Sequence, residues 1–406
     1  MARIQGAASY KEKQHHLLIG LMSGTSLDGV DAALVSIETD KHETIQKVRL
    51  EQFYYLPYSD ALRQQVMLLC SPETARVDQL TVTHYGLAEW YAYAVQQLLR
   101  QAGVAADQVD AICMHGQTVW HVAGNTQFPG PEGETSVRAS LQIGELSTVM
   151  ERTGIPVVGN FRARDLAAGG EGAPLVPYAD LILFRDEQKG RLLQNIGGIA
   201  NVTVIPAAAA DEHIFAFDTG PGNMVIDELV KEGTAGRLRF DEGGKIAASG
   251  RVSTELLEIY LADAYYQLQP PKSTGREVYG KAFVDRFRAE GHKKGLSFED
   301  MVATATALTA KTIAQAFERF VFPLVPIDQL IVSGGGAHNE TMLGMLKAEL
   351  PKHIVVMTSA QFGIPDDAKE AIAFAILGHE TLMGRPSNVP SVTGASRPVI
   401  LGNICW

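Results

Sequence analysis

The sequence has few of the features that mark secreted, zinc-binding or membrane-spanning proteins. Three cysteines occur in 406 residues (Cys70, Cys113 and Cys405), and their wide spacing includes no CxxC pair. This pattern argues against a disulfide framework or a zinc finger and fits a reducing compartment. No apolar run reaches the ~18 residues of a membrane span, and residues 1–16 lack the apolar core of a secretory signal. We therefore expect a cytoplasmic protein with no membrane partner.

The sequence also has fewer basic than acidic residues. The chain has 35 Lys and Arg against 46 Asp and Glu, which gives a net charge of -11. This balance argues against a nucleic-acid partner or an anionic membrane surface. A local phosphate site remains compatible with it. The hydrophobic content of 46% allows a core in each of the two or three domains that the length suggests.

Strand-like and helix-like segments alternate along the chain, which predicts an α/β fold. We expect a disordered extension over residues 1–16, an N-terminal α/β domain over 17–186 and a C-terminal α/β domain over 187–406. The stretch 124–136 is rich in Gly and Pro and predicts an exposed loop. After residue 190 the pattern of the first half returns, and QLIVSGGGAHN mirrors the earlier AICMHGQTV. The two domains are therefore expected to share one plan.

The loop SGTSLDG lies between two strand-like runs near the N-terminus. Gly24 and Gly29 permit close backbone approach, and Thr25 and Ser26 add hydroxyl donors. Successive backbone N–H groups in such a loop can form an anion-binding nest. It is not a Walker A loop, because no Gly-Lys-Ser/Thr follows, and a plain hairpin turn is an equally good interpretation.

Two acidic residues belong to the same region. Asp28 and Asp31 can orient the water ligands of Mg²⁺, which prefers carboxylates, phosphate oxygens and retained water. Their alternative role is to cap the turn. A charged residue that begins an apolar helical stretch, such as Glu370 in AKEAIAFAIL, is usually a solvated residue of the first turn.

Two more glycine loops follow strand-like runs in the second half. In DTGPGN, Asp218 stands at a predicted strand end, where α/β active sites concentrate. A helix that begins beside Gly220, Gly222 and Asn223 would direct backbone donors toward a phosphate. The alternative is a capped helix start.

In the other loop, SGGGAHN, three consecutive glycines follow an apolar strand-like run. Gly334, Gly335 and Gly336 remove every side chain from one place, so a flat nucleoside could lie against the backbone there. The alternative is a strand-to-helix turn that needs positive φ, for which one glycine would usually suffice.

Candidate ligand-binding residues follow two strand-like runs of the first half. In NFRARD, Arg162 and Arg164 offer guanidinium forks and Asp165 a carboxylate, although a surface ion pair is nearly as good an interpretation. In HGQTVWH, His115 can serve as a substrate ligand, but a lone histidine is more often structural.

Seven motifs occur in order: SGTSLDG, HGQTVWH, NFRARD with GAPLVP, NIGGIAN, FDTGPGN, PKSTGRE and SGGGAHN. Together they resemble the anhydro-N-acetylmuramic acid kinase family, from about residue 17 to the tail. The resemblance implies two related actin-like ATPase (ribonuclease H-like) domains with a nucleotide cleft between them. It also implies ATP and Mg²⁺ as cofactors, a small sugar as substrate and a homodimer.

The resemblance further implies that water opens the 1,6-anhydro bridge of 1,6-anhydro-N-acetylmuramic acid and that O6 is phosphorylated. The products would be N-acetylmuramic acid 6-phosphate and ADP, in cell-wall (peptidoglycan) sugar recycling. Asp218 matches the family's general base, and Glu370 a second carboxylate of the reaction. Arg164 matches a substrate-contacting arginine.

The resemblance assigns the nucleotide to two of the glycine loops. Gly334, Gly335 and Gly336 match the nucleoside side. The ATP phosphate loop is matched by Gly24, Thr25, Ser26, Leu27, Asp28, Gly29, Val30 and Asp31.

Some features depart from the family pattern or favour a relative. Many kinases of the superfamily carry an aspartate where this chain has Met22, which leaves Asp28 or Asp31 to serve the metal. PPKSTGREV and AKEAIAFA are similar to levoglucosan kinase, so that activity, which yields glucose 6-phosphate, is the alternative. An ordinary hexose kinase and a nucleotide-switched assembly module of the actin-like superfamily are further alternatives.

Overall fold

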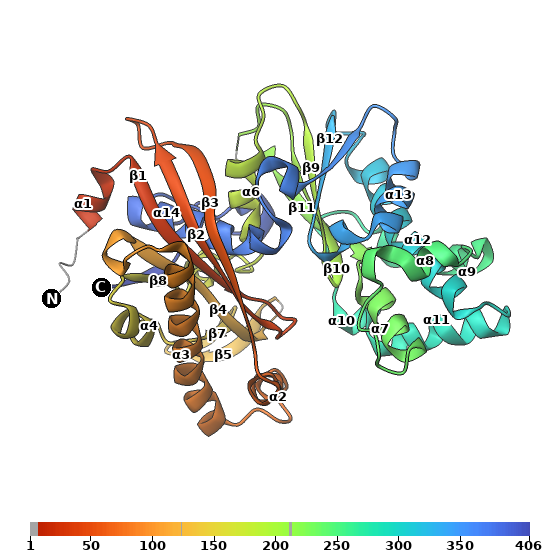
Figure 1. Cartoon of the computed structure of the whole chain (residues 1–406), viewed down its shortest axis with the longest axis horizontal. Helices are drawn as coiled ribbons and strands as arrows, with labels where there is room; N and C mark the ends of the chain where they lie inside the picture. Colours follow the sequence, from red (N-terminus) through yellow and green to blue (C-terminus); the bar gives the residue numbers. More distant parts are fainter. Residues whose placement is uncertain (1–6, 123, 211–212) are drawn as a thin grey trace. The chain divides into compact units, whose positions relative to one another are not determined.

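The computed structural model describes residues 7–122, 124–210 and 213–406, which form two compact units (Figure 1). Unit 1 comprises Met1–Leu183 together with Gly363–Trp406, and unit 2 comprises Phe184–Phe362. Each unit combines a mixed sheet with helices. The predicted α/β class is therefore confirmed.

The sheet of unit 1 has the strand order β14-β8-β4-β1-β2-β3, and β7 also pairs with β4. β1 is antiparallel to β2, and β2 to β3, whereas β4 runs parallel to both β1 and β8. The strands are β1 (His15–Ser23), β2 (Gly29–Thr39), β3 (Ile45–Pro57), β4 (Ala111–His121), β7 (Ser140–Ile143), β8 (Val157–Gly159) and β14 (Asn403–Cys405).

Two helices, α3 (Val77–Ala102) and α14 (Lys369–Met383), cover opposite faces of this sheet. Side chains alternate along β1, so Ile19 and Leu21 join the core with α3 while Gly20 faces the other way. A Cβ at Gly20 would lie 1.7 Å from the carbonyl oxygen of Ala371, so only glycine lets α14 pack this closely. The other helices are α1 (Ala7–Lys11), α2 (Asp60–Leu69), α4 (Leu146–Thr153), α5 (Arg162–Ala167), α6 (Val176–Phe184) and α15 (Pro390–Thr393).

The sheet of unit 2 has the order β11-β10-β9-β12-β13. Here β9 is antiparallel to β10, and β10 to β11, whereas β12 runs parallel to both β9 and β13. The strands are β9 (Arg191–Ile196), β10 (Ile199–Ile205), β11 (Phe215–Pro221), β12 (Gln329–Ser333) and β13 (Val355–Thr358).

The helix α12 (Phe298–Phe320) supplies much of the apolar core beside this sheet. It begins with a capping box in which Ser297 and Asp300 each accept a backbone N–H of the other. The remaining helices of unit 2 are α7 (Met224–Gly233), α8 (Lys245–Ser249), α9 (Thr254–Leu261), α10 (Arg276–Tyr279), α11 (Lys281–Lys293) and α13 (Glu340–Glu349).

The two sheets share one plan. The run β3-β2-β1-β4-β8 of unit 1 corresponds strand by strand to β11-β10-β9-β12-β13 of unit 2, with the same parallel and antiparallel pairs. β4 and β12 occupy the same place in this order, as the similar sequences AICMHG and QLIVSG predict. The expected repeat is thus present in the topology.

Three features differ from the sequence-based expectations. The stretch 124–136 holds the hairpin of β5 (Thr126–Gly130) and β6 (Gly133–Val137) instead of an irregular loop. The segment 363–406 joins unit 1 and not the C-terminal unit, because α14 packs on β1 and β14 pairs with β8. Residues 7–11 of the expected disordered extension form α1, and residues 1–6 lie outside the described residues.

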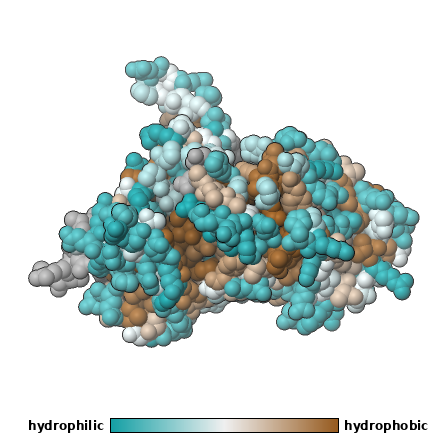
Figure 2. All heavy atoms as spheres, turned by 90° about the horizontal axis from the view of Figure 1, so that it is seen from above, coloured by the Kyte–Doolittle hydropathy of each residue, from teal (hydrophilic) through white to brown (hydrophobic). Residues whose placement is uncertain are grey.

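The surface agrees with the acidic, polar composition. Figure 2 shows hydrophilic residues over most of the face in view, with smaller apolar areas among them. Within the described part of the chain, no helix combines the length and the apolar character that crossing a membrane requires.

Candidate active site

The loop between β1 and β2 of unit 1 is held by hydrogen bonds to neighbouring parts of that unit. The buried Ser23 donates its hydroxyl to the Tyr91 hydroxyl at 2.9 Å, and Gln117 donates Nε2–H to the Gly24 carbonyl at 3.1 Å. At the other end, the Tyr58 N–H donates to the Asp28 carbonyl at 2.8 Å. These bonds fix the loop at both ends.

The residues of this loop divide into an exposed and a buried set. Thr25, Ser26 and Asp28 are exposed, so their side chains are available to a ligand. Leu27 and Val30, which the resemblance placed in the phosphate loop, are buried in the apolar core of unit 1. Any contact of these two residues with a phosphate would therefore come from their backbone. The hairpin interpretation and the binding interpretation are compatible.

Asp31 lies opposite Met22 in the pairing of β1 with β2, so the two side chains share one face of the sheet. Burial, followed by the negative charges of Asp28, Glu370 and Asp367, raises the pKa of the Asp31 carboxyl to about 7. These carboxyl groups form an acidic region that would favour a cation. However, no three possible ligands of the His, Cys, Asp or Glu type come together to hold a metal among the described residues.

Glu370 lies in the first turn of α14, next to a buried ion pair. Lys369 Nζ lies 2.9 Å from a carboxylate oxygen of Asp180, and both side chains are almost fully buried. Glu370 itself is exposed to solvent. Loss of hydration next to the surrounding protein nevertheless raises the pKa of the Glu370 carboxyl, while the positive charges of Lys369 and Arg162 lower it.

His115 and Arg162 form a close pair in unit 1. The Arg162 Nε–H donates to His115 Nε2 at 3.0 Å, and Nη2 lies 2.9 Å from the same nitrogen. Burial, followed by the Arg162 charge, lowers the pKa of His115 to about 3, so the ring is neutral and accepts these bonds. Arg162 also donates Nη1–H to the Gly172 carbonyl at 2.8 Å. Arg164, the arginine selected from the resemblance, is exposed and is not part of this pair.

Asp165 is fully buried and organises the surrounding chain. Its Oδ1 accepts from Asn388 Nδ2 at 2.8 Å and from the Thr393 hydroxyl at 2.7 Å. Its Oδ2 accepts the N–H of Gly172 at 2.8 Å. These bonds account for Asp165 as a structural residue that joins the α5 region to the C-terminal segment. A substrate contact by Asp165 stays a prediction.

In unit 2, the two predicted glycine loops meet at a turn that the sequence analysis did not assign to the site. This turn connects β9 to β10 and includes Gly197 and Gly198. The Gly222 N–H donates to the Gly198 carbonyl at 3.0 Å, and the Asn223 N–H to the Gly197 carbonyl at 2.7 Å. These donors therefore bind protein and do not point at a phosphate, contrary to what a bare helix start would suggest. The repeated Gly-Gly in NIGGIAN was the available signal for the turn.

Two glycines of the third loop fit against the same turn. A Cβ on Gly334, whose φ is +80°, would lie 2.5 Å from Asn195 Oδ1, and a Cβ on Gly336 would lie 2.4 Å from Ile196 Cγ2. Asn223 Nδ2 donates to the Ile196 carbonyl at 3.2 Å. The missing side chains thus let the β9–β10, β11–α7 and β12–α13 connections come together at one edge of the sheet.

Gly335, the middle glycine of this loop, differs from its two neighbours. It is exposed and begins a short 3₁₀ turn, Gly335–His338. A Cβ on Gly335 would approach Asn223 Nδ2 at 3.3 Å, the end of a polar side chain, and no backbone atom. Packing within the protein therefore explains Gly334 and Gly336, which corrects the expectation that all three glycines clear a surface for a ligand. The contact with a nucleoside stays a prediction, and Gly335 is the residue of the three that it depends on.

Asp218 lies on β11, beside this edge, and is partly exposed. Its Oδ2 accepts the N–H of Thr274 at 2.9 Å, and its carbonyl accepts the Tyr265 hydroxyl at 2.8 Å. A partly solvated carboxylate with a fixed orientation can remove a proton from a water or a hydroxyl group. Of the two predicted catalytic carboxylates, Asp218 lies in unit 2 and Glu370 in unit 1.

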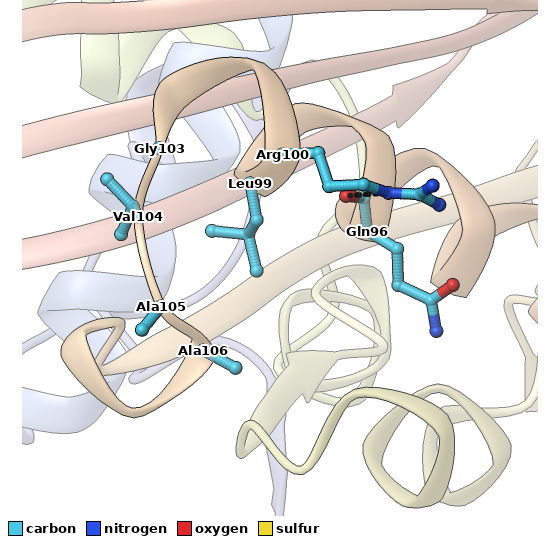
Figure 3. Close-up of a pocket in the computed structure, with 7 residues that line it drawn as sticks. All are labelled: Gln96, Leu99, Arg100, Gly103, Val104, Ala105 and Ala106. Atoms are coloured by element: carbon cyan, nitrogen blue, oxygen red, sulfur yellow. Dashed lines mark hydrogen bonds between the residues drawn. The ribbon is translucent and has the colours of Figure 1, made fainter.

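A surface depression elsewhere in unit 1 is not part of these groupings. It lies where α3 ends and the chain turns toward β4, and Arg100 there donates Nε–H to the Gln96 carbonyl at 3.3 Å (Figure 3). His115 and Gln117 lie further along β4, and none of the predicted site residues lines it. The lining residues are Gln96, Leu99, Arg100, Gly103, Val104, Ala105 and Ala106.

Comparison with known proteins gives one family. The family model of anhydro-N-acetylmuramic acid kinase matches residues 16–406. The chain is 44% identical over 392 residues to the anhydro-N-acetylmuramic acid kinase of Caldanaerobacter subterraneus subsp. tengcongensis, covering 97% of each chain. It is 46% identical over 395 residues to the protein of that name from Salinibacter ruber, covering 97% of this chain and 96% of that one.

The similarity to solved structures is much weaker. A ROK family glucokinase from Streptomyces griseus, in complex with glucose and AMPPNP, is 13% identical with a TM-score of 0.38. The match covers 89% of this chain and 98% of that one. Similarity at this level says nothing of the ligands of this chain.

Proposed function

Because the chain belongs to the anhydro-N-acetylmuramic acid kinase family, we propose that it opens and phosphorylates 1,6-anhydro-N-acetylmuramic acid with ATP. The products are N-acetylmuramic acid 6-phosphate and ADP, and the role is cell-wall sugar recycling. The observation that carries the proposed chemistry is Asp218, which lies beside the glycine loops of unit 2. Its carboxylate accepts the Thr274 N–H, and its main-chain carbonyl accepts the Tyr265 hydroxyl.

In this mechanism Asp218 accepts a proton from a water molecule while the water oxygen forms a bond to C1 of the sugar. The C1–O6 bond of the anhydro bridge breaks, and its electron pair stays on O6. O6 then bonds to the γ-phosphorus of ATP, and the bond from that phosphorus to the bridging oxygen of ADP breaks. Glu370 is the second carboxylate assigned to the reaction. Three residues of unit 1 are assigned to the substrate. The exposed Arg164 would contact it directly, whereas the buried His115 and Asp165 would act through the networks described above.

Phosphoryl transfer depends mainly on positioning and charge neutralisation. In unit 1 we assign the ATP phosphates to the loop Gly24–Asp31, which supplies the exposed Thr25 and Ser26. In unit 2 we assign nucleotide contacts to the loop of Gly220, Gly222 and Asn223. Since the N–H groups of Gly222 and Asn223 bind carbonyls, these residues shape the loop and do not donate to phosphate.

The nucleoside is assigned to the loop of Gly334, Gly335 and Gly336. Gly334 and Gly336 pack against Asn195 and Ile196 and give the loop its shape. Gly335 is exposed and offers bare backbone to a flat ligand. The nucleoside contact is therefore proposed for Gly335, with the two neighbouring glycines in supporting roles.

Mg²⁺ is proposed as the metal that accompanies ATP. Burial is the main cause of the raised pKa of Asp31, and the negative charges of Asp28, Glu370 and Asp367 add to it. These neighbouring carboxyls are the feature that fits a cation. The same residues do not form a complete ligand set. Asp28 and Asp31 would therefore hold water ligands of the ion, whose charge would neutralise the phosphates. A cytoplasmic location and a homodimer are further proposals, and sedimentation of the purified protein tests the second.

The proposed reaction can be tested with purified protein, Mg-ATP and sugars in ¹⁸O-labelled water. The sugars are 1,6-anhydro-N-acetylmuramic acid, levoglucosan, N-acetylmuramic acid and glucose, and product mass is the measurement. We expect a 6-phosphate that carries one ¹⁸O from water, formed from the anhydro-N-acetylmuramic acid. The names of the relatives do not favour levoglucosan, and a faster reaction with it would correct the substrate. Unlabelled transfer to a free hydroxyl would contradict the coupled mechanism.

A further inference from the structure

We propose that Thr274 is a positioning residue for Asp218, and that its backbone N–H, not its side chain, performs this role. The N–H donates to Asp218 Oδ2 at 2.9 Å. The inference rests on the proposed function in one respect, which is the use of Asp218 as a general base. Thr274 lies in the motif PKSTGRE, and neither the sequence nor the family resemblance assigned a role to Thr274 itself.

The contact belongs to a set that fixes both the backbone and the side chain of Asp218. Two residues before Thr274, the carbonyl of Lys272 accepts the N–H of Asp218 at 3.1 Å. The Tyr265 hydroxyl donates to the Asp218 carbonyl at 2.8 Å. One stretch, residues 265–274, therefore holds the main chain of Asp218 from both of its polar groups and the carboxylate from one oxygen.

The stretch 265–274 is itself closed by Lys272. The Lys272 ammonium donates to the Tyr265 carbonyl at 3.2 Å and lies 4.7 Å from the ring centres of Tyr265 and Phe320. Burial in this aromatic surrounding lowers the pKa of Lys272 to about 8, and the Arg319 charge adds to the effect. The Lys272–Tyr265 hydrogen bond closes residues 265–272 into a loop, and both of its ends contact the main chain of Asp218.

A backbone N–H suits this role better than a side chain. It has no rotamers, so its direction is set by the fold, and a donor of this kind favours the charged form of a carboxylate. With Oδ2 held by this donor, rotation of the carboxylate is restricted. A base must be both charged and aimed, and the Thr274 N–H promotes both conditions.

Replacing Thr274 by proline deletes the N–H. Because a hydrogen bond to a charged group is lost, we expect Thr274→Pro to lower kcat about 10- to 100-fold. We expect the KM for sugar and ATP to change by less than about 3-fold, because those contacts are made elsewhere. The acid limb of the kcat profile should move to higher pH, since the charged carboxylate loses its donor. The conservative Thr274→Val keeps the N–H and should keep the acid limb at the wild-type pH.

A second measurement needs no activity and does not depend on the folding of the proline variant. In protein labelled with ¹⁵N-threonine, the amide resonance of Thr274 is identified by its loss in Thr274→Val. We expect this amide proton to shift with pH as the carboxylate titrates, and the shift to disappear in Asp218→Asn. An amide that ignores both pH and Asp218→Asn would overturn the proposal. So would a Thr274→Pro enzyme with the wild-type acid limb.

The two proposals fail in different ways. If the amide follows Asp218 but no anhydro sugar is phosphorylated, the positioning contact stands and the proposed reaction is wrong. If the sugar is phosphorylated and the amide does not follow Asp218, the reaction stands and Thr274 has no positioning role.

Discussion

Unit 1 and unit 2 have the same strand order and the same strand directions, but they place different chemistry at the corresponding connections. In unit 1 the β1–β2 connection is long enough to carry exposed hydroxyls and acids, and charged side chains surround it. In unit 2 the β9–β10 connection is a Gly197–Gly198 turn that packs tightly against two other glycine loops. The scaffold alone therefore does not determine which connection carries charge and which carries bare backbone.

The two connections differ because different groups hold them in place. Under the unit 1 loop, buried hydroxyl and amide side chains of Ser23, Tyr91 and Gln117 hold the chain from one side. In unit 2 the loops hold one another mainly through backbone hydrogen bonds. They approach so closely that a Cβ on Gly222, Gly334 or Gly336 would meet the facing chain. A loop fixed by side chains can vary its own tip, whereas loops fixed by backbone contacts cannot gain a Cβ at the contact without moving.

The largest expected effect comes from the one carboxylate that unit 2 contributes to the proposed reaction. We expect Asp218→Asn to lower kcat more than ~100-fold with little change in binding, because the amide cannot accept the proton. In unit 1, we expect Glu370→Gln to lower kcat only about 10-fold. Glu370 is exposed, and Lys369 and Arg162 favour its charged form, which makes it a weaker base. Steady-state kinetics with both substrates varied gives the two numbers.

Binding measurements accompany these kinetics. Calorimetric titration of each variant with ATP should give affinities close to the wild-type value, which separates chemistry from binding. Near-normal turnover in Asp218→Asn would show that the base is misassigned. A larger loss in Glu370→Gln than in Asp218→Asn would move the main base to unit 1.

Much of the fold was predictable because its elements are locally consistent. Apolar runs next to Gly-containing turns indicated the strands at β1, β2, β9 and β12, which are buried along most of their length. The return of α14 to unit 1 was not predictable, because it depends on Gly20 of β1 meeting Ala371 across the sequence. The hairpin at 126–137 was hidden by its Gly and Pro content, which is typical of loops.

The candidate site was predictable in its residue types more than in its contacts. The three glycine loops and Asp218 were recognised from their motifs, and the structure brings the unit 2 loops together. The partners of Asp165 were not, because Asn388 and Thr393 are far away in the sequence. The pairing of His115 with Arg162 also needs tertiary structure, since both arginines of NFRARD look equally suitable in the sequence.

The run of three glycines shows the same limit of sequence reasoning. The letters of SGGGAHN are identical at the three positions, so nothing local distinguishes them. The structure separates Gly334 and Gly336, which face the β9–β10 turn, from Gly335, which faces solvent. That distinction depends on Asn195 and Ile196, which lie about 140 residues earlier in the chain and reach this loop only through the parallel pairing of β9 with β12.

A smaller effect tests how each unit fixes its loop. A Cβ on Gly222 would lie 2.2 Å from the Gly197 carbonyl oxygen, so we expect Gly222→Ala to lower the free energy of unfolding by about 1–3 kcal/mol. A Cβ on Gly24 meets nothing closer than Ser26 Oγ at 3.3 Å, so Gly24→Ala should change it by less than ~1 kcal/mol in either direction. Urea titration of the two variants measures both.

The contrast between the two glycines depends on where the new methyl group goes. If Gly222→Ala were as stable as the wild type, the backbone contact with Gly197 would not be tight, and the unit 2 loops would be as adaptable as the loop of unit 1. Equal losses in the two variants would remove the distinction between the units altogether.

The smallest expected effect belongs to a carboxyl of unit 2, Asp227. Its pKa is raised to about 7, as is that of Asp31 in unit 1. Asp227 is raised by burial and then by the charge of Asp241, which accepts the N–H groups of Ile246 and Ala247. The native state therefore keeps a proton on Asp227 that the unfolded chain loses near its ordinary pKa value of 3.8. Stability falls between about pH 4 and pH 7 and then levels off.

Asp227→Asn removes this titration, so the variant should become more stable than the wild type as the pH rises. We expect a gain of about 1–2 kcal/mol at pH 8, less than the full shift would give at ~1.4 kcal/mol per unit, because the amide changes the local hydrogen bonding. The gain should shrink toward pH 5, where the wild-type carboxyl is already neutral in the fold. Thermal unfolding at pH 5 and pH 8 measures it. A difference of the same size at both pH values would mean that Asp227 does not hold a proton, and that raised carboxyls are confined to the acidic loop region of unit 1.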